Sequence, residues 1–259
     1  MKVALAQFDI KFGDPKANEK RVEELTKEAA DGNADVVVFP EMWNTGYALD
    51  KLDQLADEKG EETKQLFYKL ARQYQIGIVG GSVAVKENGK FYNRTLVVDP
   101  VGEVVGQYDK VHLFRLMHEH KFLTAGEQES YFRIAGVPSA SFICYDLRFP
   151  EWIRTVALHG AAVLYFPAEW PSARIEQWEI MLKARAVENQ TFVVAVNRVG
   201  KDPDNQYNGH SLVIDPLGHV IADAGDKDGI TFADIDLDQL NQVRGPIPVF
   251  ADRKPKLYK

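Results

Sequence analysis

Short apolar segments recur along this chain, and segments with one polar face separate them. Residues 34–39 read ADVVVF, and similar apolar segments cover residues 161–166 and 191–197. A strand that is apolar on both faces is typical of a sheet covered by helices. Residues 18–30 and 173–190 carry apolar side chains at helical spacing, so each predicts a helix with one buried face. This alternation predicts an α/β fold.

Two strings in the chain are nearly the same. Residues 96–105 read LVVDPVGEVV, and residues 212–221 read LVIDPLGHVI. The shared D-P-x-G sequence favours a tight turn, so each string predicts a strand–turn–strand hairpin within a mixed sheet. We interpret the strings as parts of two similar halves. Because no linker rich in Pro, Gly or Ser separates the halves, we expect residues 1–259 to form a single domain.

Composition excludes several classes of protein. The chain has 259 residues, enough for a large core, and its net charge of −7 argues against nucleic acid as a partner. No apolar segment approaches the roughly 20 residues needed to cross a membrane. The single cysteine excludes an intrachain disulfide, and the N-terminal MKVALA leads into a strand rather than a signal peptide. We therefore expect a cytoplasmic protein that binds neither nucleic acid nor membrane.

Cys144 lies where an apolar segment gives way to polar residues. Residues 140–143 predict the end of a buried strand, and Pro150 is typical of the first turn of a helix. A strand-to-helix bend offers free backbone N–H groups, which can lower a thiol pKa and hold an oxyanion. Cys144 is therefore a candidate nucleophile, and the alternative is a buried structural cysteine.

Two ionisable residues also follow predicted strands. Glu41 comes after the segment 34–39, and Lys110 comes after the predicted strand 103–108. A carboxylate could take the proton of Cys144, and an ammonium could stabilise the thiolate and an oxyanion. The alternatives are a solvated acid for Glu41 and a surface lysine for Lys110. A histidine partner for the cysteine, His112 or His118, also stays open.

Two motifs suggest ligands but lack the required partners. The sequence His118-Glu119-His120 lies in a long irregular connector, and it has neither a helical HExxH frame nor a second Cys/His cluster. We therefore expect no metal site, and Glu119 is either an auxiliary carboxylate or a solvated charge. Residues 76–84 predict one buried strand. The pair Gly80-Gly81 within it is not followed by the Lys and Ser/Thr of a phosphate loop, so we interpret it as a site of close packing.

Three separated motifs resemble the carbon–nitrogen hydrolase (nitrilase) superfamily. They are FPE at 39–41, YDKVHL at 108–113 and ICYDLRFPE at 143–151. The resemblance extends over essentially the whole chain. It implies a four-layer α-β-β-α sandwich with two mixed sheets. It also implies Glu41 as base, Lys110 as oxyanion stabiliser, Cys144 as nucleophile and Glu119 as auxiliary carboxylate, with no metal or organic cofactor.

Within the superfamily, the loops EMWNTGY and AEWPSARIEQW are most similar to the omega-amidase branch. The resemblance implies hydrolysis of the terminal amide of 2-oxoglutaramate or 2-oxosuccinamate through a thioester. Hydrolysis of N-carbamoyl amines or aliphatic amides, or a non-catalytic thiol sensor, stays open. A remote carboxylate on the substrate calls for a cation or hydroxyls, so the expected binding residues are Tyr47, Trp170 and Arg174. The backbone N–H of Tyr145 is expected to hold the oxyanion.

Two further expectations concern packing. Arg148 is interpreted as structural, paired with Asp146 or Glu151. The resemblance also implies a homodimer, with contacts from the helix after Cys144 and from the C-terminal tail, residues 245–259.

Overall fold

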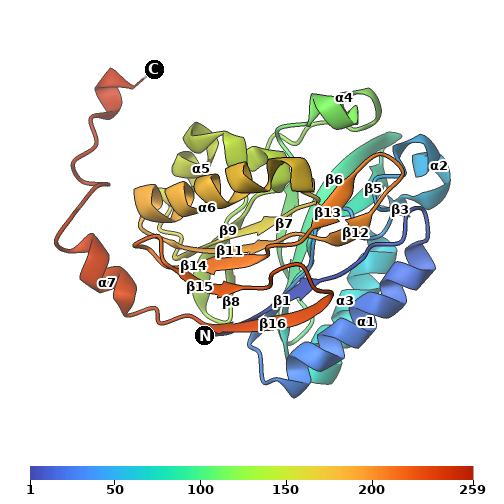
Figure 1. The fold of residues 1–259 in the computed structure, drawn as a ribbon, viewed down its shortest axis with the longest axis horizontal. Coiled ribbons are helices and arrows are strands. Elements are labelled where there is room, and N and C mark those ends of the chain that lie inside the picture. The colour runs from blue at the N-terminus through green and yellow to red at the C-terminus, as the bar shows by residue number, and fades with distance from the viewer. Residues whose placement is uncertain (259) are drawn as a thin grey trace.

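Two β-sheets lie face to face in the middle of the molecule, and helices cover the outer face of each sheet (Figure 1). The structure is a computed structural model that describes residues 1–258; Lys259, the last residue of the predicted tail, lies outside the described residues. The expected four-layer α-β-β-α sandwich is confirmed. Within residues 1–258, no helix is long and apolar enough to cross a membrane.

The first sheet has eight strands and comes mainly from the N-terminal half of the chain. Its order is β16-β1-β2-β4-β6-β5-β3, with β7 paired to β6. Parallel pairs join β1, β2 and β4, and antiparallel pairs join β6 to β5 and β7, so the sheet is mixed as expected. The strands are β1 Lys2–Gln7, β2 Val36–Val38, β3 Asp57–Glu58, β4 Gly77–Val79, β5 Val83–Glu87, β6 Lys90–Val98, β7 Val104–Asp109 and β16 Gly229–Asp234.

The second sheet has six strands in the order β15-β14-β11-β10-β9-β8, and it is also mixed. Its strands are β8 Phe132–Ile134, β9 Val137–Ser141, β10 Val163–Pro167, β11 Phe192–Val196, β14 Leu212–Ile214 and β15 Val220–Asp223. A separate two-stranded ribbon consists of β12 Val199–Lys201 and β13 Gln206–Asn208.

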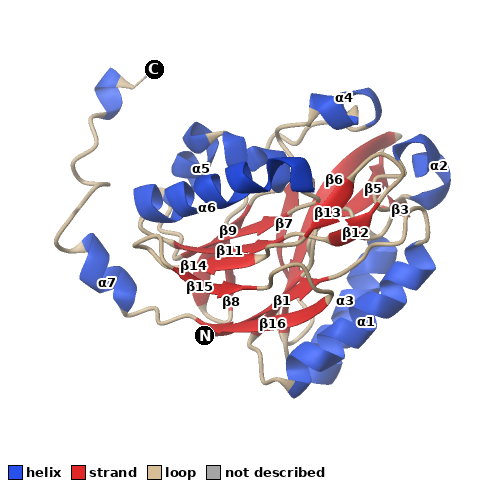
Figure 2. Ribbon diagram, in the orientation of Figure 1, coloured by secondary structure: helices blue, strands red, loops and turns tan. Residues whose placement is uncertain are grey.

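The longer helices form the two outer layers (Figure 2). Helices α1 and α3 cover the first sheet, and α5 and α6 cover the second. Helix α1 begins where the Asp14 side chain accepts a hydrogen bond from the Ala17 N–H, with Pro15 in the first turn. The helices are α1 Pro15–Asp31, α2 Leu52–Leu55, α3 Glu61–Tyr74, α4 Glu119–Phe122, α5 Pro150–Ala157, α6 Ile175–Asn189 and α7 Gln239–Arg244.

The surroundings of strand β2 explain why its sequence is apolar throughout. Val37 packs on the helix side of the first sheet, among residues of α1 and α3. Val36 and Val38 point the other way and pack against β10 and β11 of the second sheet. Both faces of the strand are therefore buried, as its unbroken apolar sequence predicted.

The two D-P-x-G strings form matching hairpins, β6–β7 and β14–β15. In the first turn, Asp99 Oδ1 accepts hydrogen bonds from the N–H groups of Val101 (3.0 Å) and Glu103 (2.9 Å). Asp215 Oδ1 makes the same pair of bonds in the second turn, at 2.8 and 2.9 Å. Both hairpins also shift register in the strand before the turn. The prediction of repeated hairpins is confirmed.

The predicted single strand over residues 76–84 is wrong, because two strands occupy it. Strand β4 ends at Val79 and β5 begins at Val83. Gly81 between them has a φ of +61°, and a Cβ there would overlap the Pro40 carbonyl oxygen. A Cβ at Gly80 would overlap the Phe67 ring. The glycines do serve close packing, as predicted, and the same packing interrupts the strand.

Candidate active site

Glu41, Lys110 and Cys144 come together at the ends of three strands. Glu41 lies just beyond β2, Lys110 directly follows β7, and Cys144 lies just beyond β9. All three side chains are buried, with 0%, 1% and 6% of their surface exposed. Because β2 and β9 belong to different sheets, the stacking of the two sheets is what closes this cluster.

The Lys110 ammonium bridges two buried carboxylates. Its Nζ donates to Glu41 Oε1 at 2.7 Å and to Glu119 Oε1 at 2.6 Å. Glu119 opens the short helix α4, and its Oε2 accepts a 2.6 Å hydrogen bond from the Phe114 N–H. The predicted second carboxylate of the connector therefore lies in the cluster, not in solvent.

The Tyr47 hydroxyl lies between the same two carboxylates. It is 2.6 Å from Glu41 Oε1 and 2.5 Å from Glu119 Oε1. A hydroxyl has one proton, so it can donate to only one of them at a time. Sequence reasoning expected Tyr47 to bind substrate, and the structure gives its hydroxyl a different set of partners, the two carboxylates.

Burial and neighbouring charges give Glu41 and Glu119 different pKa values. Burial raises the pKa of Glu41, but the Lys110 ammonium, with help from hydrogen bonds, brings that pKa below its usual value. Burial also raises the pKa of Glu119; Lys110 opposes this and Glu41 adds to it, so the pKa of Glu119 stays above its usual value. Burial lowers the pKa of Lys110, and the two carboxylates raise it by more. Lys110 thus stays charged, and Glu119 takes up a proton before Glu41 does.

Cys144 begins a 3-10 turn that runs to Arg148 and leads into α5. Its φ of +44° is unusual for a residue with a side chain, and such strain is typical of functional sites. The turn is held by Asp146, whose Oδ2 accepts hydrogen bonds from the Ile143 N–H (2.9 Å) and the Tyr108 hydroxyl (2.8 Å). His112 bonds to the same Asp146 at 2.7 Å and stacks on the Phe149 ring. It therefore does not pair with Cys144.

A small cavity opens beside Cys144. Its volume is about 10 Å³, roughly the room for one water molecule. Its lining includes Tyr145, Trp170 and Arg174, which were predicted to bind substrate. The full set of lining residues is Phe114, Cys144, Tyr145, Arg148, Glu169, Trp170, Pro171 and Arg174.

Arg174 borders a second and larger space. A cavity of about 610 Å³ lies outside the site, and both Tyr47 and Arg174 line it. The Arg174 guanidinium lies 5.7 Å from the Phe114 ring centre. Arg174 therefore stands between the narrow space at Cys144 and an outer cavity of a size that suits small ligands.

The predicted pairing of Arg148 with Asp146 or Glu151 is wrong. Its guanidinium donates to Gln177 Oε1 at 3.0 Å and lies 5.0 Å from the Trp170 ring centre. Asp146 is instead occupied by backbone N–H groups, Tyr108 and His112. The 3-10 turn explains the difference, because it aims Arg148 at the cavity wall.

Sequence reasoning missed two residues that hold Glu41. Asn93 in β6 donates to Glu41 Oε1 at 2.8 Å, and the backbone N–H of Glu169 donates to Oε2 at 2.9 Å. The sequence does point to Asn93, because the polar residues Asn93-Arg94-Thr95 interrupt a strand whose other central residues are apolar. The bond from Glu169 has no such sign, because a backbone N–H exists at any residue other than proline.

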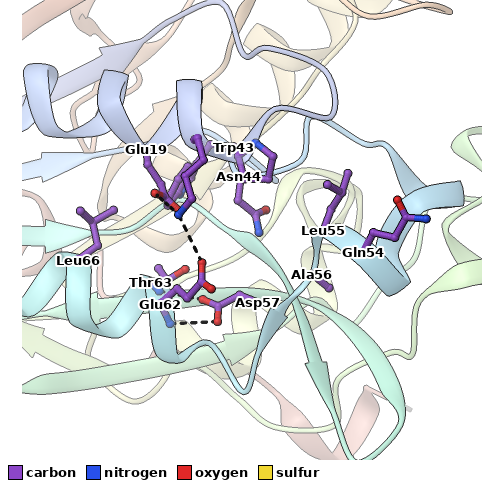
Figure 3. Close-up of a pocket in the computed structure, with 12 residues that line it drawn as sticks. Glu19, Trp43, Asn44, Gln54, Leu55, Ala56, Asp57, Glu62, Thr63 and Leu66 are labelled. Carbon is purple, nitrogen blue, oxygen red and sulfur yellow. Dashed lines mark hydrogen bonds and ion pairs between the residues drawn. The ribbon is translucent and has the colours of Figure 1, made fainter.

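A separate cavity of about 240 Å³ lies between α1 and α3 (Figure 3). Trp43 and Asn44 form part of its wall, but none of Glu41, Lys110 and Cys144 lines it. The Asp57 carboxylate there accepts hydrogen bonds from two N–H groups at the start of α3. Across residues 1–258, no group of three or more His, Cys, Asp or Glu side chains is placed to hold a metal ion.

Comparison with known proteins places this geometry in a family. The family model described as carbon-nitrogen hydrolase matches residues 2–245. A 2-oxoglutaramate amidase from Bacillus subtilis (strain 168) is 47% identical over 99% of this chain and 98% of its own length. The human omega-amidase NIT2 is 32% identical over 98% of this chain and 96% of its own length.

A solved structure agrees with the same placement. It is XC1258 from Xanthomonas campestris, a CN-hydrolase superfamily protein with an arsenic adduct in its active site. That protein is 31% identical, has a TM-score of 0.92, and the match covers 98% of this chain and 97% of that one. Because the family match and the relatives span nearly the whole chain, this protein belongs to the carbon-nitrogen hydrolase family and is a hydrolase of carbon–nitrogen bonds.

Proposed function

We propose that this carbon-nitrogen hydrolase releases ammonia from the terminal amide of small 2-oxo dicarboxylic acid monoamides, such as 2-oxoglutaramate and 2-oxosuccinamate. The observation that carries the proposal is that a cation, Arg174, lines the same cavity as Cys144. A monoamide of this kind carries its charge at the end opposite to the amide. A guanidinium near the nucleophile suits such a substrate, because it pairs with carboxylates in two parallel hydrogen bonds. The 47% identity to a 2-oxoglutaramate amidase supports the same substrate class.

In the first half of the reaction, Cys144 attacks the amide carbon and its proton passes to Glu41. Burial raises the pKa of the Cys144 thiol, and the Glu41 charge raises it further, while Lys110 lowers it by less. The cysteine therefore starts as a neutral thiol, and its proton leaves as the sulfur–carbon bond forms. Glu41 is the acceptor because its pKa is held low, so it is ionised at neutral pH.

The oxyanion that forms on the amide oxygen is stabilised by Lys110 and by the Tyr145 backbone N–H. Glu41 then gives its proton to the departing nitrogen, the carbon–nitrogen bond breaks, and ammonia leaves. A thioester stays on Cys144. In the second half, Glu41 takes a proton from water, the hydroxide adds to the thioester, and the carbon–sulfur bond breaks. The sulfur recovers the proton from Glu41, so the enzyme returns to its first state and the acid leaves.

Glu119 keeps Lys110 in place during these steps. Two carboxylates hold the ammonium, at 2.7 and 2.6 Å, so it stays oriented when Glu41 becomes protonated. The second carboxylate oxygen of Glu119 accepts a hydrogen bond from the Phe114 N–H, and this bond holds α4 against the site. We propose for Glu119 the role of auxiliary carboxylate.

Substrate entry requires side chains at the cavity wall to move. The space of about 10 Å³ beside Cys144 is too small for a dicarboxylate monoamide, whereas the outer cavity of about 610 Å³ is not. Arg174 lines both spaces. We propose that its guanidinium swings aside with the entering carboxylate and holds it, with Trp170 as the wall behind the carbon chain.

We also propose that residues 1–259 act as one domain in the cytoplasm and that two copies form a homodimer. Helix α6 leaves Ile180 (67%) and Val187 (48%) exposed, and Leu158, just after α5, is 40% exposed. Beyond α7 the chain runs away from the sheets past these helices (Figure 1). Its Phe250 lies 5.1 Å from the Arg154 guanidinium of α5. The exposed helix face and the tail are the contacts that this proposal assigns to the dimer.

Ammonia release tests the substrate class. The panel comprises 2-oxoglutaramate, 2-oxosuccinamate, glutamine, asparagine, propionamide and an N-carbamoyl amine. We expect the 2-oxo amides to have the highest kcat/KM and Cys144→Ala to abolish their turnover, because no sulfur is left to form the thioester. Turnover of only the N-carbamoyl compound or only propionamide would reject the 2-oxo amides in favour of the other family reactions. No turnover at all would favour the thiol sensor.

Arg174→Ala gives the same experiment a second arm. We expect KM for 2-oxoglutaramate to rise about ten- to a hundredfold, since a hydrogen bond to a charged group contributes about 1.5–3 kcal/mol. The KM for neutral propionamide should stay within about twofold. Arg115→Ala, a change at an exposed arginine outside the cavity, serves as the control. If KM for the anionic amide is unchanged in Arg174→Ala, Arg174 does not bind the substrate carboxylate.

A further inference from the structure

A third buried acid, besides Glu41 and Glu119, lies beside the site and has no part in the steps above. Glu169 follows β10, and none of its surface is exposed. Its backbone N–H donates to Glu41 Oε2 at 2.9 Å, while its side-chain Oε2 accepts from Arg198 at 2.8 Å. One residue thus contacts Glu41 through the main chain and Arg198 through the side chain.

Arg198 is itself held from several directions. It is fully buried and donates to the Ile10 carbonyl at 2.8 Å and to Asp9 Oδ1 at 3.2 Å. Its guanidinium also lies 4.5 Å from the centre of the Tyr207 ring. Asp9 and Ile10 follow β1 of the first sheet, and Arg198 follows β11 of the second. The arginine therefore links the two sheets at the edge where the site lies.

The two oxygens of Glu41 have different surroundings. Oε1 lies within hydrogen-bond distance of Lys110, Tyr47 and Asn93. Oε2 accepts from the Glu169 N–H. Because Oε1 accepts from the Lys110 ammonium and the Asn93 amide, it is the poorer proton acceptor, so Oε2 is the oxygen that suits the transfer from Cys144. The direction of that oxygen then depends on where residue 169 lies.

We propose that Glu169 and Arg198 form a positioning pair for the base: Arg198 fixes the Glu169 side chain, and thereby the N–H group that orients Glu41 Oε2. The inference rests on the proposed role of Glu41 as base. Neither residue of the pair reacts with substrate. A further contact fits this role, because the Glu41 N–H reaches the Ala168 carbonyl at 3.4 Å, so the segment 168–169 meets Glu41 at both its backbone and its side chain.

The charges around Glu169 indicate that its hydrogen bond matters more than its charge. The pKa of Glu169 is raised to about 8: burial raises it most, Arg198 opposes this, and Glu41 and Asp202 raise it further. Asp9 and Tyr207 are the other titratable groups against Arg198, and burial keeps the Tyr207 hydroxyl neutral. A carboxyl that is largely neutral at pH 7 can be replaced by an amide, which still offers an oxygen to Arg198.

The test compares Glu169→Ala with Glu169→Gln. In Glu169→Ala the N–H loses its anchor, so kcat should fall between about tenfold and a hundredfold. The acid limb of the kcat/KM profile should also move to higher pH, because the Glu169 N–H is one of the groups that lower the pKa of Glu41. Glu169→Gln should restore both kcat and the acid limb, since its amide oxygen can still accept from Arg198.

Leu25→Ala is the control for lost stability. Leu25 is fully buried between α1 and the first sheet, so its truncation destabilises the fold without touching the site. This variant should keep the parent's acid limb. An acid limb in Glu169→Ala that matches the parent would overturn the proposal, and so would a Glu169→Gln as impaired as Glu169→Ala.

Two choices separate this inference from the substrate assignment. The kinetics are measured with whichever compound of the panel the parent enzyme hydrolyses, so loss of the 2-oxo amide assignment leaves the comparison intact. The pH dependence of Cys144 alkylation by iodoacetamide reports the same shift without any substrate. If alkylation of Glu169→Ala follows the parent's pH profile, the positioning role is wrong, even in a protein without turnover.

Discussion

The thiol of Cys144 lies between groups that shift its pKa in opposite directions. Burial raises this pKa, the Glu41 carboxylate raises it further, and the Lys110 ammonium lowers it. The net effect is a pKa well above that of a free cysteine. The residue is therefore reactive only through its neighbour: the carboxylate that keeps the thiol neutral also takes its proton.

This balance predicts the effect of Glu41→Gln on the thiol. Removing the carboxylate charge removes an influence that raises the thiol pKa and leaves the ammonium that lowers it. The thiol pKa should therefore fall by about one unit or more, although the variant loses its base and with it catalysis. Because Cys144 is the only cysteine, the ultraviolet absorbance of its thiolate can be titrated directly, with Cys144→Ala as the blank. A pKa in Glu41→Gln equal to or above the parent's would contradict the assigned balance.

At the scale of elements, the break between β4 and β5 sets the place of Glu41. Gly81 lies against the Pro40 carbonyl, so the chain that carries Glu41 and the chain that leaves β4 touch at the backbone. The Gly81 carbonyl also accepts a 2.7 Å hydrogen bond from Thr95 of β6. These contacts leave no room for a side chain at position 81.

Gly81→Ala should therefore impair stability and activity together. Gly89 is a matched control, since both glycines have a positive φ (+61° and +74°) but a Cβ at Gly89 meets nothing within 4 Å. We expect Gly89→Ala to cost about 1–2 kcal/mol from backbone strain alone, and Gly81→Ala at least about 2 kcal/mol more, as for an overpacked core. Urea unfolding measures the stability and ammonia release the activity. If the two variants lose the same free energy of unfolding, the contact with Pro40 does not add to the destabilisation.

At the scale of the whole molecule, the proposed dimer assigns self-association to exposed apolar side chains of α6, of the end of α5 and of the tail. A stable dimer buries roughly 800 Å² on each partner. The exposed apolar side chains assigned to the proposed contact are Ile180 of α6, Leu158 just after α5, and Ile247 and Tyr258 in the tail. Gathered apolar side chains on a surface are typical of interaction sites, and in the proposed dimer a second copy covers them.

Light scattering after size exclusion tests this assignment. We expect a mass of twice the 29.2 kDa chain for the parent and a monomer for Ile180→Glu, because a charge would be buried without a partner. Val101→Glu is the control: Val101 is 58% exposed, at the turn of the β6–β7 hairpin, so it should keep the parent's mass. A monomeric mass for the parent protein would refute the proposed dimer. A dimeric mass for Ile180→Glu would show that the interface does not involve Ile180.

The sequence by itself predicted the alternation of strands and helices, the hairpins and the candidate catalytic residues. Each of these follows from local information: apolar runs mark buried strands, D-P-x-G marks a turn, and Glu41, Lys110 and Cys144 come soon after strands at the edge where α/β folds place their chemistry. The resemblance of three motifs to a known superfamily added Glu119 and the four-layer stacking. The single strand over residues 76–84 was wrong because the contacts that interrupt it come from Phe67 and Pro40.

Only the tertiary structure decided how Glu41 is held. Its partners Asn93, Lys110 and Glu169 lie 52, 69 and 128 positions away in the chain, and Arg198 lies 189 positions from Asp9. No local pattern encodes such contacts, because two sheets must first stack before these residues meet. Arg148 illustrates the same limit: its charge favoured an acidic neighbour in sequence, and the 3-10 turn at Cys144 directs it to Gln177 and Trp170 instead.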